Sequence, residues 1–174
     1  GAGPAGAAEI VRALVRVYLE SPLDEDNRSG AATALTAILD DPAARVRRVM
    51  AEALAESADA PRVVIRALAE DQADIAHLIL SRSPVLTDAE LVDMVGGGYE
   101  RVRISIASRP QVSIGISAAI AEVAGPDACV ALLDNPGASI TVSALKRMVE
   151  RHRHDAAVRH CCLLSPSDAA DKQP

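Results

Sequence analysis

Four segments of the chain repeat one order of residues. Each has an acidic or Gly/Pro turn, a first helical stretch, a break containing serine or proline, and a second helical stretch. Their anchoring apolar residues are Val46, Ile75, Val102 and Ile140, which lie 29, 27 and 38 residues apart. A period of this size indicates stacked helix pairs, because one pair cannot bury its apolar face alone.

The clearest copy is "LDDPAARVRRVMAEALAES", residues 39–57. Asp40 or Asp41 is expected to cap its helix, with Pro42 in the first turn. A later helix is expected to be capped by Thr87 or Asp88, with Glu90 following. Two apolar stripes at helical spacing are predicted to be buried. The first is Val46, Val49, Met50, Ala53 and Leu54, and the second is Val64, Ile65, Leu68 and Ala69.

The apolar residues are almost all aliphatic. The chain has no Phe or Trp, and Tyr18 and Tyr99 are its two aromatic residues. This composition favours closely packed helices over a β-sandwich or barrel. Ten or eleven helices of 8–15 residues and no sheet are therefore expected, including a pair at 8–20 and 26–39 before the repeats.

Three ranges describe the expected domain organisation. Residues 8–164 are predicted to form one domain. Residues 1–7 are expected to be disordered or to be a processed or artificially added end. The polar residues 165–174 are expected to be disordered.

The order "LDDPxxxVRxxxAExLA" in residues 39–55, echoed by "YERVRISIASRP", resembles HEAT-like repeats. The period of roughly 28 residues and the "VR…A.RP" pattern are also similar to the leucine-rich-variant repeat. Over about residues 8–164 the chain resembles an uncharacterised bacterial family of HEAT-like proteins, a domain of unknown function. The resemblance implies an all-α fold, a right-handed α-solenoid of stacked antiparallel helix pairs. It implies no activity, because solenoids serve many functions.

Two arginines share one position in the repeat. Arg47 and Arg103 each follow an anchor valine, and we interpret them as structural struts. Each is expected to reach an acidic turn residue of a neighbouring repeat, such as Asp71, Asp74 or Asp127. Of the neighbouring arginines, Arg48 is expected to pair with Glu52 four residues later, and Arg45 stays available to a partner.

A candidate interaction surface consists of exposed basic residues on two stretches of the chain. They are Arg45, Arg48, Arg62, Arg66, Lys146, Arg147, Arg151 and Arg153. The first four could instead contact phosphate groups, although Glu52, Glu56 and Glu70 lie between them. The net charge of −6 opposes nucleic-acid binding in general.

The stretch "LKRMVERHRHDAAVRHCC" permits four interpretations. It could form the polar face of a capping helix, dock an acidic partner, contact nucleic acid or bind a metal ion. The metal reading would use pairs such as His152 with His160 or His154 with Cys161, whose spacings differ from those of zinc sites. Cys161 and Cys162 are expected to be small core residues, and no metal or cofactor is expected.

The sequence contains no recognisable catalytic motif. The chain has no Ser-His-Asp set and no phosphate-binding glycine loop after a strand. We therefore expect a non-enzymatic scaffold that binds a protein partner or a further domain of a longer chain, with homodimerisation left open. The alternative is a nucleic-acid-binding module that uses the arginine-rich helices. The absence of a signal peptide and of a membrane span, with three unpatterned cysteines, favours the cytoplasm.

Overall fold

The computed structural model describes residues 3–164, and over this range the chain is all-helical. It contains eleven helices of 8 to 17 residues and no strand there, which confirms the all-α prediction. The contacts divide the chain into two compact units, Gly1–Leu86 and Thr87–Pro174. A single domain over 8–164 stays a prediction, and the tail at 165–174 lies outside the described residues.

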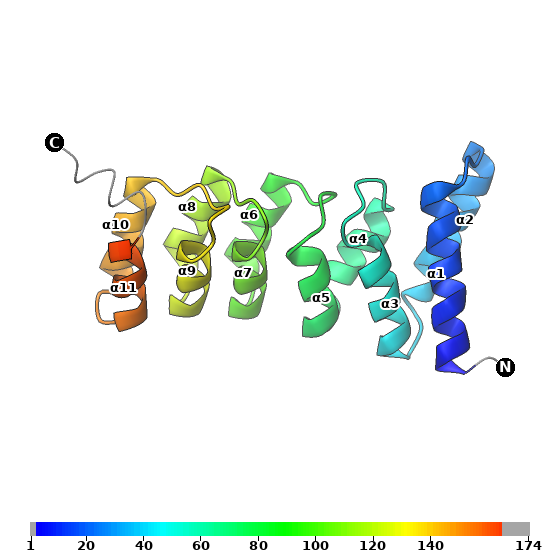
Figure 1. The fold of residues 1–174 in the computed structure, drawn as a ribbon, viewed down its shortest axis with the longest axis horizontal. Coiled ribbons are helices and arrows are strands. Elements are labelled where there is room, and N and C mark those ends of the chain that lie inside the picture. Colours follow the sequence, from blue (N-terminus) through cyan, green and yellow to red (C-terminus); the bar gives the residue numbers. More distant parts are fainter. Residues whose placement is uncertain (1–2, 165–174) are drawn as a thin grey trace. The chain divides into compact units, whose positions relative to one another are not determined.

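The first unit contains two rows of helices. Its helices are α1 (Pro4–Glu20), α2 (Glu25–Ile38), α3 (Ala44–Leu54), α4 (Arg62–Ala69) and α5 (Ala73–Leu80). Helix α1 packs against α3 and α3 against α5, while α2 packs against α4 (Figure 1). Helix α1 begins at Pro4, so residues 4–7 are helical and the helix predicted over residues 8–20 starts four residues earlier. The proline fits there because the first turn needs no N–H donor from it.

The second unit has the same organisation. Its helices are α6 (Asp88–Gly97), α7 (Glu100–Ala107), α8 (Ile114–Val123), α9 (Pro126–Leu133), α10 (Val142–Arg151) and α11 (Ala156–Leu164). One row consists of α7, α9 and α11, and the other of α6, α8 and α10 (Figure 1). In both rows each helix packs against the helix that follows it two places later in the chain, as α7 does against α9.

The helix starts correct the predicted repeat phase. Helices α3, α5, α7, α9 and α11 begin 26 to 30 residues apart. Ile140, the predicted fourth anchor, lies in the loop between α9 and α10. The equivalent third position of α9 is held by buried Ala128 and that of α11 by buried Val158. This repeat phase is hard to recognise in the sequence. The third residue of α9 is alanine where α3, α5 and α7 have valine or isoleucine, and no arginine follows that alanine.

The core contains most of the predicted stripes. All four residues of the second stripe are buried, as predicted. In the first stripe Ala53 is exposed, whereas Ala51 is fully buried. Helix α3 packs against α1, α4 and α5, so its buried arc is shifted from the one expected for a single contact face.

Local capping marks the row of α6, α8 and α10. The Thr87 hydroxyl accepts from the Glu90 N–H at 3.2 Å and the Glu90 carboxylate accepts from the Thr87 N–H at 2.8 Å, the predicted capping box. Ser113 and Thr141 cap α8 and α10 in the same position. The prediction for α3 is wrong, because Asp41 accepts from the Ala43 N–H and closes the turn before a helix that starts at Ala44.

Backbone groups join two loops of the second unit. The Val112 N–H donates to the Gly137 carbonyl at 3.1 Å, and the Ser139 N–H donates to the Val112 carbonyl at 2.9 Å. A Cβ on residue 137 would lie 1.8 Å from the Pro110 carbonyl oxygen. Only glycine therefore lets these loops approach so closely.

Candidate interaction surface

Arg47 connects α3 to the turn before α5. Its Nε and Nη2 donate to the two carboxylate oxygens of Asp71 at 2.7 and 3.0 Å, and its Nη1 donates to the Asp41 carbonyl at 2.6 Å. The side chains of Arg47 and Asp71 are only 16% and 14% exposed. The hydrogen bond from Arg47 holds the pKa of Asp71 below its usual value. Asp71 is one of the three partners suggested by the sequence, and this guanidinium is engaged within the fold.

Arg48 pairs with Asp74 rather than with Glu52, its expected partner. Asp74 lies in the first turn of α5, and the packing of α3 against α5 brings it to Arg48. Both side chains are nearly half exposed, so this pair contributes little to stability.

The other arginines of the first predicted group are exposed. Arg45 and Arg66 lie on the surfaces of α3 and α4. Arg62 Nη1 donates to the Val85 carbonyl at 3.0 Å. Arg48 and Arg62 are thus attached to neighbouring segments of the first unit.

Arg103 takes a different partner from Arg47. Its Nε donates to the Val95 carbonyl at the end of α6 at 2.9 Å, and its Nη1 lies 3.5 Å from Glu100. It does not reach Asp127 in the way that the repeat phase suggested. Arg103 therefore holds α7 against the preceding helix.

Glu100 is a residue of the second unit whose role sequence reasoning missed. Its carboxylate accepts hydrogen bonds from the Gly125 N–H at 2.8 Å and the Ala128 N–H at 3.2 Å, at the start of α9. A Cβ on residue 125 would lie 3.0 Å from a Glu100 oxygen, so the glycine leaves room for the carboxylate. An acidic residue in the first turn of a helix is already explained by its interaction with the N-terminus of that helix. No signal in the sequence therefore indicated this longer-range role.

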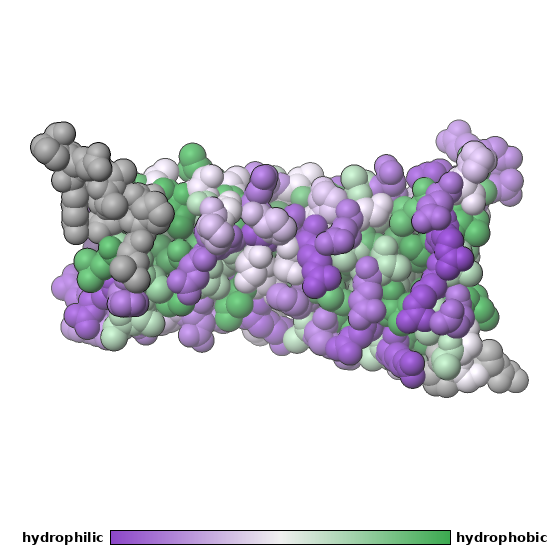
Figure 2. Space-filling view, viewed as in Figure 1, coloured by the Kyte–Doolittle hydropathy of each residue, from purple (hydrophilic) through white to green (hydrophobic). Residues whose placement is uncertain are grey.

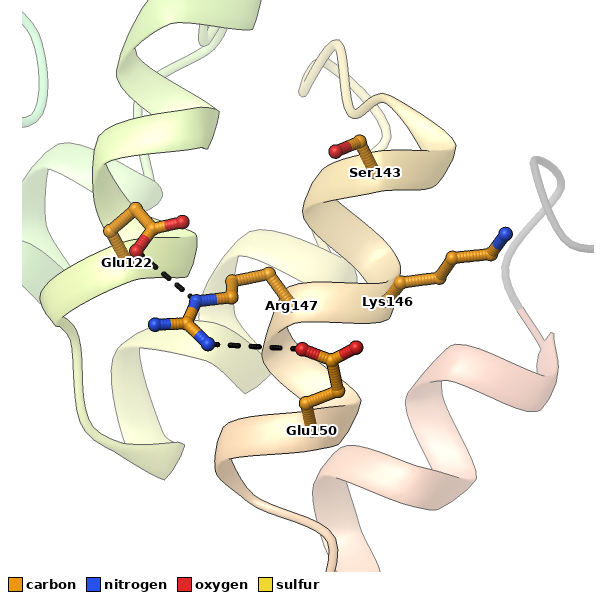
Figure 3. Close-up of a pocket in the computed structure, with 5 residues that line it drawn as sticks. All are labelled: Glu122, Ser143, Lys146, Arg147 and Glu150. Atoms are coloured by element: carbon orange, nitrogen blue, oxygen red, sulfur yellow. Dashed lines mark hydrogen bonds and ion pairs between the residues drawn. The ribbon is translucent and has the colours of Figure 1, made fainter.

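The basic stretch on α10 lines a pocket of about 380 Å³ between α8 and α10 (Figure 3). Arg147 lies between two carboxylates there, with its Nε 3.1 Å from Glu122 and its Nη1 3.7 Å from Glu150. Ser143 and Lys146 complete the lining, and the Lys146 amine points away from the two carboxylates. The charge of Arg147 is thus balanced within the pocket.

Two further residues of this stretch hold the end of α8. Arg151 Nη1 donates to the carbonyls of Ala121 and Ala124 at 2.9 Å each, and His152 Nε2 lies 2.9 Å from the same Ala124 oxygen. Arg153 is exposed. Among the predicted residues of α10 and its following loop, Lys146 and Arg153 are therefore the cations most accessible to a partner.

The histidines and cysteines of the described range form no metal-binding group of three or more side chains. Within residues 3–164 no group of three or more His, Cys, Asp or Glu side chains could hold an ion. Cys129 and Cys162 are buried, and burial raises the pKa of the Cys129 thiol to about 11. Cys161, expected in the core, is only partly buried, and its thiol donates to Asp134 at 3.4 Å.

Polar and apolar residues are interspersed on the face shown in Figure 2, where purple and green areas alternate. Seven large apolar side chains are among the exposed residues. They are Ile10, Val17, Val63, Tyr99, Ile114, Val123 and Leu163. In the described part of the chain, no helix has both the length and the hydropathy to cross a bilayer.

A protein-family model matches residues 75–169, more than half of the 174 residues, and is described as an uncharacterised protein conserved in bacteria (DUF2336). The chain belongs to the DUF2336 family. The DUF2336 match begins within α5 and contains Glu100, Arg147 and Arg151, whereas the Arg47–Asp71 pair precedes it. No curated protein and no solved structure matches the chain.

Proposed function

We propose that this DUF2336 protein is a non-enzymatic scaffold of HEAT-like repeats, a right-handed α-solenoid. It binds another protein, or another domain of a longer chain, in the cytoplasm. One observation carries the proposal: charged side chains join successive helix pairs, over separations of about one repeat. Arg47 reaches Asp71, 24 residues later, and Glu100 reaches Gly125, 25 residues later.

These contacts engage charged side chains that could otherwise bind or react with a ligand. The donors of Arg47 and Arg151, and the carboxylates of Asp71 and Glu100, face partners within the fold. Stacking of neighbours creates an extended surface whose length grows with the number of repeats, which suits protein binding.

Part of the predicted surface is accessible to a partner. Arg45, Lys146 and Arg153 are exposed. Within residues 3–164 their side chains form no ion pair. These three cations are therefore the residues to change first.

The test is capture of partners by the tagged full-length chain in the cell that encodes it, followed by reconstitution with purified components. R45E/K146E/R153E is expected to weaken the reconstituted complex more than R16E/R82E/R159E, which makes the same change in charge at other exposed arginines. A chain that reconstitutes with no captured protein would contradict the scaffold.

Nucleic acid is the alternative in this test. A low-salt gel-shift assay with a 20-nucleotide strand, single or double, is expected to show no retarded complex because the body of the chain is acidic. A specific complex that R45E/K146E/R153E abolishes would favour the nucleic-acid-binding module instead.

A further inference from the structure

Three loops of the second unit lie side by side at one edge. Glu100, at the start of α7, accepts from Gly125 in the loop before α9 at 2.8 Å. His152, in the loop before α11, lies 2.9 Å from the Ala124 carbonyl of that same middle loop. Because α7, α9 and α11 pack in one row, the loops preceding them are consecutive along the edge.

This edge exposes the side chains that dominate many protein interfaces. Tyr99 is 73% exposed, whereas Tyr18 is only 7% exposed. The Arg101 guanidinium lies over the Tyr99 ring, 5.0 Å from its centroid. Val123, the last residue of α8 before the middle loop, is 39% exposed, and Arg153 of the third loop is exposed. Tyrosine and arginine are enriched among the residues that carry most of the binding energy.

Two carboxylates of these loops are engaged within the fold, whereas Asp127, at the start of α9, is exposed. Glu100 accepts from the start of α9, and Asp155 accepts from the Val158 N–H at 3.0 Å. Arg101 and Arg153 form no ion pair within residues 3–164. In a chain of net charge −6 this edge therefore presents two arginines without a carboxylate partner, beside one exposed carboxylate.

We propose that the edge formed by Tyr99, Arg101, Val123 and Arg153 binds an extended acidic segment of a partner protein. The inference rests on the proposed scaffold function and specifies the chemistry of its partner. Neighbouring helices lie about 8–10 Å apart, so three loops span about 20 Å. An extended segment of about six residues covers that length. Carboxylates meet Arg101 and Arg153, and apolar side chains meet Tyr99 and Val123.

Charge and aromatic content favour a peptide over a nucleic acid. Binding to a single strand uses a continuous basic groove with several stacking aromatic rings. The edge has one exposed tyrosine and two unmatched arginines, and exposed Asp127 lies at the start of α9.

The experiment is an NMR titration of the 15N-labelled full chain with a pool of eight-residue peptides. The pool alternates Glu with Leu, Val, Tyr or Ala, and a second pool has Lys in place of Glu. The acidic pool is expected to shift the amides of Tyr99, Arg101, Val123 and Arg153. R101E/R153E is expected to bind it about tenfold more weakly, and Tyr99→Ala also more weakly.

R16E/R82E is the matched control, because it changes the charge equally at exposed arginines of the first unit. It should bind within about twofold of the wild type, and circular dichroism should show every variant folded. Absence of shifts at the edge, equal weakening by the control, equal binding of the lysine pool, or tighter binding of a 12-nucleotide single strand would each overturn the proposal. A reconstituted partner that binds R101E/R153E as tightly as the wild type would refute the proposed binding site at this edge. The proposed scaffold function would be unaffected by that result.

Discussion

The Glu100 carboxylate caps a helix that begins 26 residues later in the chain. It accepts from the N–H groups of Gly125 at 2.8 Å and Ala128 at 3.2 Å. Helices α6, α8 and α10 instead receive a cap from the serine or threonine directly before them. The N-terminus of α9 therefore depends on tertiary contact, whereas those of α6, α8 and α10 are capped locally.

Glu100→Gln is expected to lower the free energy of unfolding by about 1–2 kcal/mol, because a charged cap is replaced by a neutral amide with fewer acceptors. Urea unfolding followed by circular dichroism measures the change. Glu122→Gln is the control, since Glu122 pairs at an exposed site and should cost under about 1 kcal/mol. Equal losses in the two variants would show that Glu100 contributes no more than a surface carboxylate.

The Arg47–Asp71 pair should show strong coupling. A double-mutant cycle with Arg47→Met and Asp71→Asn is expected to give an interaction energy of about 1–3 kcal/mol, because the ion pair is bidentate and mostly buried. The same cycle on Arg48 and Asp74, which are nearly half exposed, should give about 0–0.5 kcal/mol. Similar values for both cycles would contradict this ranking.

The same aspartate gives the stability a dependence on acidic pH. Arg47 lowers the pKa of Asp71 in the folded state, so the stabilisation is fully present above the unfolded-state pKa of about 4. It is lost as the pH falls through the lower folded-state pKa. Urea midpoints measured from pH 6 to pH 2 should fall more steeply for the wild type than for Asp71→Asn. Parallel curves would refute the linkage.

Two buried serines of the second unit should respond differently to alanine. The Ser117 hydroxyl is fully buried and has no hydrogen-bond partner within residues 3–164, whereas the Ser105 hydroxyl donates to the Arg101 carbonyl at 3.1 Å. Ser117→Ala should raise the free energy of unfolding. The free energy of unfolding of Ser105→Ala should be about 1 kcal/mol lower than that of Ser117→Ala, because Ser105→Ala removes a hydrogen bond. Thermal and urea unfolding of both variants provide the comparison, and the opposite order would show that Ser117 forms a hydrogen bond in solution.

The three thiols should react at different rates. Cys161 is partly exposed, while Cys129 and Cys162 are buried, and burial raises the pKa of Cys129 to about 11. At pH 8 a colorimetric disulfide reagent should therefore modify Cys161 first, and all three thiols should react in urea. Cys161→Ser should remove the fast phase, and a fast phase that persists in this variant would place another thiol at the surface.

Local patterns predicted what local physics determines. The buried stripe on α4 and the Thr87–Glu90 capping box follow from residues within one or two turns. Features set by tertiary neighbours were missed or misassigned. Glu100 resembles an ordinary first-turn acid, and Arg48 pairs with Asp74 of another helix although Glu52 lies one turn away. The Arg47–Asp71 contact was accessible to sequence reasoning because the arginine recurs at the repeat period and its partner follows in an acidic turn.

The contact between the Gly137 loop and the Pro110 loop has an evolutionary consequence. Two backbone hydrogen bonds fix the register of these loops, and there is no space for a side chain at residue 137. A single-residue insertion in either loop would shift that register and disconnect two neighbouring helix pairs. Relatives of this protein are therefore expected to vary in length by gain or loss of whole helix pairs, and insertions of one or a few residues should occur elsewhere in the chain.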